Sequence, residues 1–172
     1  MWSMTIDDFV YTALGYDGEK GIDMFLLNRA KDEGKEIQEV ESMLFQLEMR
    51  GSLSPELQEI LLADSVDAYQ NSDNSEELDQ LLQAWCEGDE STVTELLMAE
   101  TDTVDEELMP LMEEFEKAMI TDRNIGMADF AENALQEDEQ VFICVGLAHI
   151  IGEGGMVDLL TQRGYTVEQV NG

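Results

Sequence analysis

The sequence predicts an α/β fold that is rich in helices and holds a small, mainly parallel sheet. Apolar residues recur at helical spacing through most of the chain. Three short segments, 36–40, 140–145 and 165–170, instead carry β-branched or aromatic residues in a compact or alternating pattern. The last two flank a glycine-rich loop and a short helix. We therefore expect a C-terminal βαβ unit, which should be right-handed and parallel.

The first part of the chain predicts short amphipathic helices separated by clear boundaries. Apolar spacing places these helices over 4–14, 21–33, 42–49 and 54–69. Gly34 suits the position just after the second helix. Ser54 and Pro55 predict the start of the fourth, because serine caps a helix and proline is favoured in its first position. Between the second and third helices, KEIQEV at 35–40 supplies the first predicted strand.

The second part predicts more helices and the other two strands. Helices are expected over 76–87, 89–100, 105–119, 122–136 and 156–163. Pro110 falls inside the third of these, so its true start is expected near 109. The polar stretch at 71–75 predicts a turn. QVFICV at 140–145 and YTVEQV at 165–170 predict strands on either side of the loop and the last helix.

Length and charge narrow the functional classes. With 172 residues, the chain predicts one domain over 1–172. Its 40 acidic and 8 basic residues give a formal net charge of −32. A nucleic-acid binder needs a basic face, so nucleic acid is excluded as a partner, and anionic membranes would repel the chain. The 44% of hydrophobic residues and their periodicity predict a real core beneath a charged surface.

The histidine and cysteine content and the absence of targeting signals narrow the possible sites and locations further. The chain has one histidine, which excludes sites that need two histidines from this chain alone. Cys86 and Cys144 are predicted to be buried free thiols. The N-terminus carries acids where a signal peptide needs bases. The longest apolar run, 141–151, is far too short to cross a bilayer. We therefore predict no signal peptide and no membrane span, while the compartment stays open.

The residues best suited to chemistry follow the second predicted strand. His149 lies just beyond that strand, and ligands of open α/β sheets bind at the carboxyl ends of strands. Gly146 allows a sharp turn, while Gly152 and the glycines after it could direct backbone N–H groups towards an anion or a carbonyl oxygen. His149 could bind a metal or act as acid or base, or it could be a structural histidine in a turn. The residues leave both interpretations open.

Two further positions are candidates. Arg123, followed by Asn124, could orient a carboxylate or a substrate carbonyl, or it could form a surface ion pair of little energetic value. Glu41 ends the first predicted strand and could lie at the same sheet edge. Its spacing also suits a solvated glutamate at a helix start.

At these residues the chain resembles a known family. The segments GIDMFLLNRAKDEGKEIQEVES, SPELQ, TDRNIGMADF and VFICVGLAHIIGEGGMVDLLTQRGYTVEQV resemble, in this order, the C-terminal part of the TraB/PrgY/GumN domain. The resemblance covers about residues 15 to 172, and the Tiki-type membrane proteases are similar to the same group. Family members combine two G-x-x-H motifs with acidic and arginine residues between them. Tiki-like members are described as metal-dependent peptidases.

The resemblance implies roles for individual residues. The second G-x-x-H motif corresponds to 146–149, and the first has no counterpart here. His149, Glu41 and Arg123 would be catalytic, and His149 and Glu41 would also bind a divalent metal ion such as Mn²⁺, Co²⁺ or Zn²⁺. Substrate-binding roles would fall to Asn124, Gly146 and Gly152. Because a catalytic metal normally takes three protein ligands, the site is expected to be incomplete in this chain.

Two functions follow as expectations. The first is a metal-dependent peptidase of the TraB/GumN type with an incomplete site. The alternative is a non-catalytic module that binds a peptide or a protein, by strand addition or in a helix groove. An open edge of the predicted sheet would also allow a homodimer.

Overall fold

The computed structural model describes residues 2–70, 75–98, 106–137 and 140–170, and all the regular secondary structure among them is helical. These residues contain no β-strand. The structure therefore corrects the predicted α/β class and its parallel sheet to an all-helical fold. The chain divides into two compact units, residues 1–75 and 76–172, and each is described separately.

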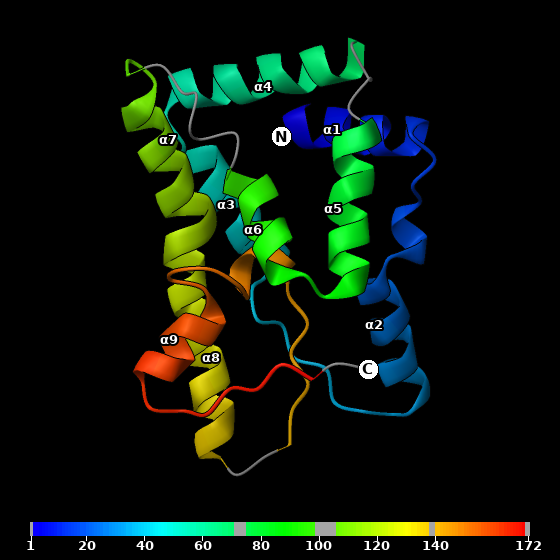
Figure 1. The fold of residues 1–172 in the computed structure, drawn as a ribbon, viewed down its shortest axis with the longest axis vertical. Coiled ribbons are helices and arrows are strands. Elements are labelled where there is room, and N and C mark those ends of the chain that lie inside the picture. Colours follow the sequence, from blue (N-terminus) through cyan, green and yellow to red (C-terminus); the bar gives the residue numbers. More distant parts are fainter. Residues whose placement is uncertain (1, 71–74, 99–105, 138–139, 171–172) are drawn as a thin grey trace. The chain divides into compact units, whose positions relative to one another are not determined.

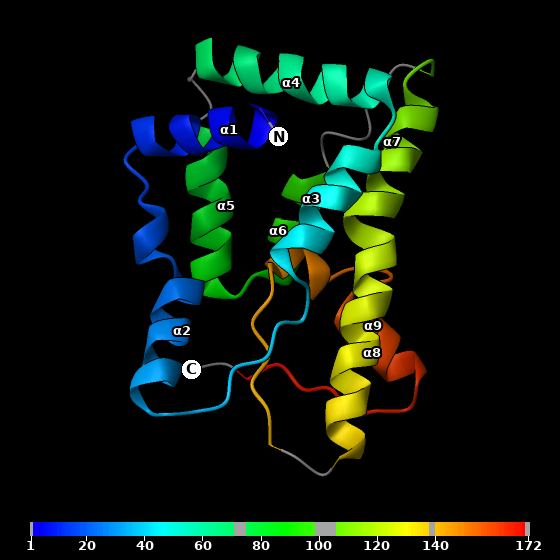
Figure 2. The same cartoon turned by 180° about the vertical axis from the view of Figure 1, so that it is seen from behind.

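The first unit contains four α-helices among its described residues. They are α1 (Trp2–Ala13), α2 (Ile22–Asp32), α3 (Met43–Ser52) and α4 (Pro55–Gln70), with a short 3₁₀ turn η1 (Gly18–Lys20) before α2. Helix α1 packs against α4, as both ribbon views show (Figure 2). Leu57 in α4 is 2% exposed and, with the neighbouring Leu53, contributes apolar core.

Serines cap two helices of this unit, and the sequence predicts the cap at Ser54 and a helix start at 42. The hydroxyl of Ser42 accepts a hydrogen bond from the Phe45 amide at the start of α3. The hydroxyl of Ser54 accepts one from the Leu57 amide at the start of α4. Each side chain satisfies a backbone donor that has no partner within its own helix, which explains why these boundaries could be predicted.

The second unit is built around one long helix. Helices α5 (Ser75–Glu87) and α6 (Glu90–Met98) come first. Helix α7 (Met109–Glu116) continues through a π-helical segment η2 (Lys117–Thr121) into α8 (Asp122–Gln136), without a break, as a single column (Figure 1). The observed start at Met109 confirms the boundary expected from Pro110. After α8 come the 3₁₀ turn η3 (Leu147–His149) and α9 (Met156–Gln162), which packs against α8.

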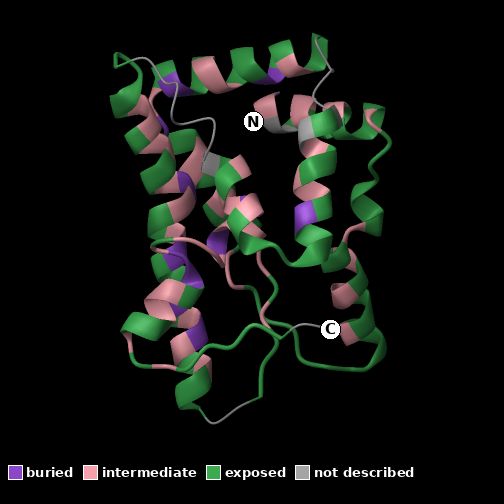
Figure 3. Ribbon diagram, viewed as in Figure 1, coloured by how far each residue is buried: buried purple, intermediate pink, exposed green. Residues whose placement is uncertain are grey.

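One side of α8 carries much of the buried surface of this unit. Asn124, Met127, Ala128 and Ala131 recur at helical spacing and are all buried (Figure 3). Met119 and Met156, from η2 and α9, are also buried. Small and flexible side chains allow other elements to approach this side of α8 closely. The same side holds Asn124, a polar residue that must find hydrogen-bond partners there.

The three predicted strands are wrong. Segments 36–40, 140–145 and 165–170 form neither helix nor strand. Phe142 is 78% exposed and Val170 is 90% exposed, whereas a strand of a parallel sheet is buried on both faces. An alternating pattern becomes a strand only when another strand satisfies its backbone groups, and no such ladder forms among the described residues.

Two further expectations depended on the predicted sheet and are wrong without it. Without a βαβ unit, His149 does not lie at the carboxyl edge of a sheet but in the turn η3. The described residues also offer no open sheet edge through which a homodimer could form. The thiols differ from expectation as well: Cys86 and Cys144 are free, as predicted, but both are exposed.

Candidate functional site

His149 is buried in the turn that follows segment 140–146. It ends η3, and its backbone amide donates to the carbonyl of Gly146 at 2.9 Å, which closes the turn. The side chain is only 7% exposed. Burying an imidazole costs free energy unless its nitrogen atoms find partners. The surroundings of the ring therefore decide what it can do.

Asn124 on α8 is the polar partner of this histidine. Its Oδ1 lies 2.8 Å from Nδ1 of His149, and its Nδ2 donates to the carbonyl oxygen of Gly154 at 2.9 Å. Asn124 is 2% exposed, so both bonds lie inside the protein. The amide thus links α8 to both ends of the glycine-rich loop. The role of Asn124 in binding substrate stays a prediction, while the structure places its amide in contacts within the chain.

The glycine-rich loop is held by its own hydrogen bonds. Gly152 and Gly154 adopt positive φ values of 79° and 71°, which favour glycine. The amide of Gly154 donates to Oδ2 of Asp158 at 2.8 Å, and that of Gly155 donates to the carbonyl of Gly152 at 3.2 Å. Two of the amides expected to face an anion are therefore used inside the loop. Gly146 precedes η3, and its role in binding substrate likewise stays a prediction.

The carboxylate of Asp158 accepts a hydrogen bond from the glycine-rich loop. The Gly154 amide, and after it the side chain of Gln162, stabilise its ionised form and hold the pKa of this carboxyl below its ordinary value. The carboxylate lies in the first turn of α9, where the helix dipole also favours negative charge. The loop that carries His149 is thus attached to α9 as well as to α8.

Arg123 and Glu41 lie in separate units. Arg123 is half-buried in the first turn of α8, and its Nη1 donates to the carbonyl of Met119 in the π-helical segment at 3.1 Å. Glu41 precedes α3, is half-buried, and its Oε2 accepts from Nε2 of Gln46 at 3.2 Å. The expected convergence of Glu41 with His149 and Arg123 therefore stays a prediction.

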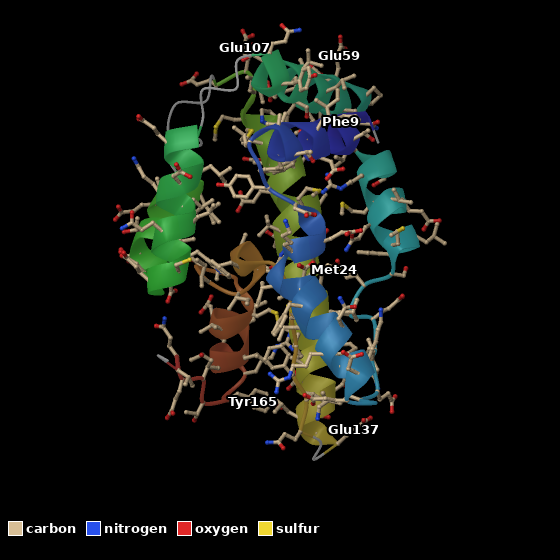
Figure 4. The ribbon with its side chains drawn as sticks, turned by 90° about the vertical axis from the view of Figure 1, so that its right-hand side faces the viewer. Phe9, Met24, Glu59, Glu107, Glu137 and Tyr165 are labelled. Carbon is tan, nitrogen blue, oxygen red and sulfur yellow. The ribbon has the colours of Figure 1, made fainter. Side chains whose placement is uncertain are left out.

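A second polar cluster, which the sequence does not predict, joins α8 to the end of α9. Arg163, just after α9, donates to Asp129 at 2.7 Å and to Glu132 at 2.8 Å, both on α8. Tyr165, labelled in Figure 4, donates from its hydroxyl to the same Glu132 at 3.2 Å. The sequence held one signal of this cluster. Asp129 and Glu132 are three residues apart on one helix face, in a half of the chain with few cations.

No group of three residues of the metal-binding types gathers anywhere within the described ranges. Three or more His, Cys, Asp or Glu side chains placed to hold one ion are not found there. A closed donor set for a catalytic metal is therefore not assembled by the described part of either unit. Among those same residues, no helix is long and apolar enough to cross a bilayer.

Comparison with known proteins identifies the chain at family level. The model of the TraB/PrgY/gumN family matches residues 1–169. No curated protein and no solved structure matches the chain. The match extends the resemblance seen in the sequence to residues before 15.

Proposed function

We propose that this chain, which belongs to the TraB/PrgY/gumN family, carries the histidine-bearing part of a peptide hydrolase site. His149 is the group that takes and returns protons in this proposal. Arg123 stabilises negative charge on the substrate carbonyl oxygen, and Glu41 is a further base or ligand. Gly146 and Gly152 shape the loop beside the substrate. The family resemblance supplies the reaction class, and the surroundings of His149 supply the structural support.

The observation that carries the proposal is the buried contact between His149 and Asn124. The 2.8 Å distance joins the only histidine of the chain to a fully buried amide. A general base needs a defined ring orientation, and a positioned hydrogen bond to one nitrogen provides it. The activity of His149 variants distinguishes a general base from a structural histidine.

The proposed chemistry needs only ordinary proton transfers. A water molecule gives a proton to the His149 ring as its oxygen attacks the carbonyl carbon of a peptide bond. Negative charge then develops on the carbonyl oxygen, where a guanidinium such as that of Arg123 would stabilise it. When the C–N bond breaks, the proton passes from the imidazolium to the leaving amine. Atoms and charges balance without a further reactant.

The divalent metal implied by the family resemblance does not fit the described residues as a complete centre. His149 and Glu41 would supply two of the three ligands that a catalytic metal normally needs. No third His, Cys, Asp or Glu joins either of them within the described residues. We therefore derive no catalytic step through Mn²⁺, Co²⁺ or Zn²⁺, and metal dependence becomes an outcome of the experiment.

The test is cleavage of a defined peptide mixture, followed by mass spectrometry, with each metal in turn and with EDTA. The native chain should cleave, and His149→Ala should reduce the rate about 100-fold or more. Glu41→Gln and Arg123→Ala should also reduce it. Their matched controls, Glu39→Gln and Lys117→Ala, change exposed residues nearby and should leave the rate unchanged. Equal rates for the native chain and His149→Ala would contradict the proposal.

The alternative is a module that binds peptides or proteins without catalysis. Apolar side chains on segments 140–145 and 165–170 favour it, because Phe142 and Val170 are highly exposed on backbone that is not helical. An added peptide strand could pair with such a segment. Peptide binding that survives His149→Ala and EDTA, in the absence of cleavage, would support this alternative. Sedimentation would show whether a second copy of the chain is the partner.

A further inference from the structure

We infer that Asn124 is a positioning residue that holds the His149 imidazole with its proton on Nδ1. In the neutral ring, Nε2 then carries the lone pair that accepts a proton or binds an electrophile. The inference deepens the proposed function and rests on it for its catalytic meaning. The protonation pattern itself follows from the hydrogen bonds among Asn124, His149 and Gly154.

The orientation of the Asn124 amide is determined by Gly154. A carbonyl oxygen can only accept a hydrogen bond, so the atom of Asn124 that lies 2.9 Å from the Gly154 oxygen must be the nitrogen. The other end of the amide, which faces His149, must therefore be the oxygen. This removes the ambiguity that usually accompanies the oxygen and nitrogen of an asparagine side chain.

The orientation of the amide in turn determines the proton on the ring. Oδ1 of Asn124 is an acceptor only, and it lies 2.8 Å from Nδ1 of His149. A hydrogen bond at this distance requires Nδ1 to be the donor. A neutral imidazole carries one proton on its two nitrogens, so Nε2 is left unprotonated.

The surroundings keep this arrangement in place. Asn124 is 2% exposed and His149 is 7% exposed, so water competes poorly for either bond. The Gly154 carbonyl is held by its own residue, whose amide donates to Asp158. The polar chain from Asp158 through Gly154 and Asn124 therefore reaches the histidine ring. Breaking it at Asn124 would leave a buried donor or acceptor without its partner.

The single histidine makes a direct measurement possible. Two-bond ¹H–¹⁵N correlation spectra of the uniformly ¹⁵N-labelled full chain contain one set of imidazole signals. Recorded at about pH 8.5, roughly two units above the ordinary pKa of histidine, they report the neutral ring. We expect a pyrrole-type shift for Nδ1 and a pyridine-type shift for Nε2. The reverse pattern in the native chain would overturn the inference.

Three variants test whether Asn124 is the cause. Asn124→Asp keeps an acceptor for Nδ1 but loses the donor to the Gly154 carbonyl, so the proton should stay on Nδ1 while the protein becomes less stable. Asn124→Leu has similar size but no acceptor, so the ratio of the two neutral forms should shift about tenfold or more towards a proton on Nε2. Asn133→Leu alters an exposed residue of the same helix and should change nothing. An unchanged pattern in a folded Asn124→Leu protein would refute the positioning role.

The measurement stays informative if a variant fails or the proposed activity is absent. Should Asn124→Leu not fold, the spectrum of the native chain still decides which ring nitrogen carries the proton, and a proton on Nε2 would still overturn the inference. If Nδ1 carries the proton but no peptide is cleaved, the inference holds and the proposed hydrolase function fails. If peptides are cleaved while Nε2 carries the proton, the hydrolase function holds and the inference fails.

Discussion

Gly155 and Gly126 show how differently two glycines depend on their surroundings. A Cβ added to Gly155 would overlap the carbonyl oxygen of Ile151 and lie 2.8 Å from that of Ile150. These are backbone atoms, which cannot move without moving the loop that carries His149. A Cβ added to Gly126, within α8, would meet nothing within 4 Å. Steric crowding thus matters at the first position, and helix propensity at the second.

Gly155→Ala should therefore destabilise the protein by about 1–3 kcal/mol, because it overpacks the loop. Gly126→Ala should instead stabilise it by about 0.5–1 kcal/mol, since alanine is the better helix former at this exposed position. Urea unfolding of both variants and the native chain measures the difference. Equal changes of the same sign would show that the loop has room for a methyl group at Gly155.

Asp158 should make part of the stability depend on pH. Its pKa in the folded protein is lowered, first by the hydrogen bond from the Gly154 amide, so the unfolded chain binds this proton more readily. The stabilising contribution is complete above the ordinary pKa of about 4 and is lost as pH falls through the lowered value. Asp158→Asn should therefore flatten the acid side of the stability curve.

Thermal unfolding followed by circular dichroism between about pH 2 and 6 measures this effect. Glu153→Gln, on an exposed residue of the same loop, is the control and should retain the native slope in this range. An Asp158→Asn curve parallel to the native one would mean that the hydrogen bond from Gly154 does not stabilise the folded state.

The column formed by α7, η2 and α8 organises the second unit. A π-helical segment shifts the register of the residues that follow it, and such segments often lie at functional sites. Here it ends at Thr121, one turn or less before Arg123 and Asn124. Two polar connections then attach later segments to α8, one through Asn124 to the loop and one through Arg163 beyond α9. The helix is therefore the support on which the candidate site is built.

Arg163→Gln should lower the melting temperature more than Arg29→Gln. Arg163 is 24% exposed and bridges α9 to Asp129 and Glu132 on α8, so its loss removes a tertiary connection. Arg29 pairs with Glu33 one turn away on an exposed surface, where ion pairs contribute little. Calorimetry of the two variants compares them directly. An equal decrease would show that the α8 to α9 connection adds nothing beyond a local pair.

The large negative charge of the chain should determine how its thermal stability changes with salt. Of the 8 basic residues, three lie in 76–172, namely Lys117, Arg123 and Arg163. With a net charge of −32, repulsion among carboxylates opposes the compact state. Salt shortens the range of this repulsion, to about 10 Å at 0.1 M.

The melting temperature should therefore rise between about 0.01 M and 0.5 M sodium chloride. Chloride is preferable to sulfate, because sulfate also strengthens apolar burial. The control is the same titration with an uncharged osmolyte at equal osmolality, which should give a smaller rise over that range. A melting temperature that falls with sodium chloride would mean that ion pairs outweigh repulsion in this protein.

Helix positions could be predicted closely from the sequence, but the fold class could not. Helix α8 was expected over 122–136 and is observed there, and Ser42, Ser54 and Pro110 mark their boundaries as predicted. The three alternating segments, by contrast, were assigned as strands because β-branched residues favour them. Such a pattern shows that one segment could pair as a strand. Whether it does depends on a partner strand, which a short stretch of sequence does not reveal.

The candidate site was predictable in part for the same reason. His149 and its glycine loop stand out in the sequence, and the structure places them beside α8. Asn124 was predicted next to Arg123, yet its contact with His149 was not. One signal could have revealed it: Asn124 shares helical spacing with Met127, Ala128 and Ala131, and a polar residue on an apolar face needs a buried partner.

Helices and their ends were thus specified locally, because each helical hydrogen bond closes within four residues and each cap within three. Tertiary structure was needed wherever the partner is distant. Asn124 meets His149 and Gly154 across separations of 25 and 30 residues. The same distinction decides the segments predicted as strands, since a strand exists only through a neighbour that the local sequence does not contain. The sequence therefore determined the helices and identified the single histidine. Only the packing of α8 against the loop decided that Asn124 is its partner.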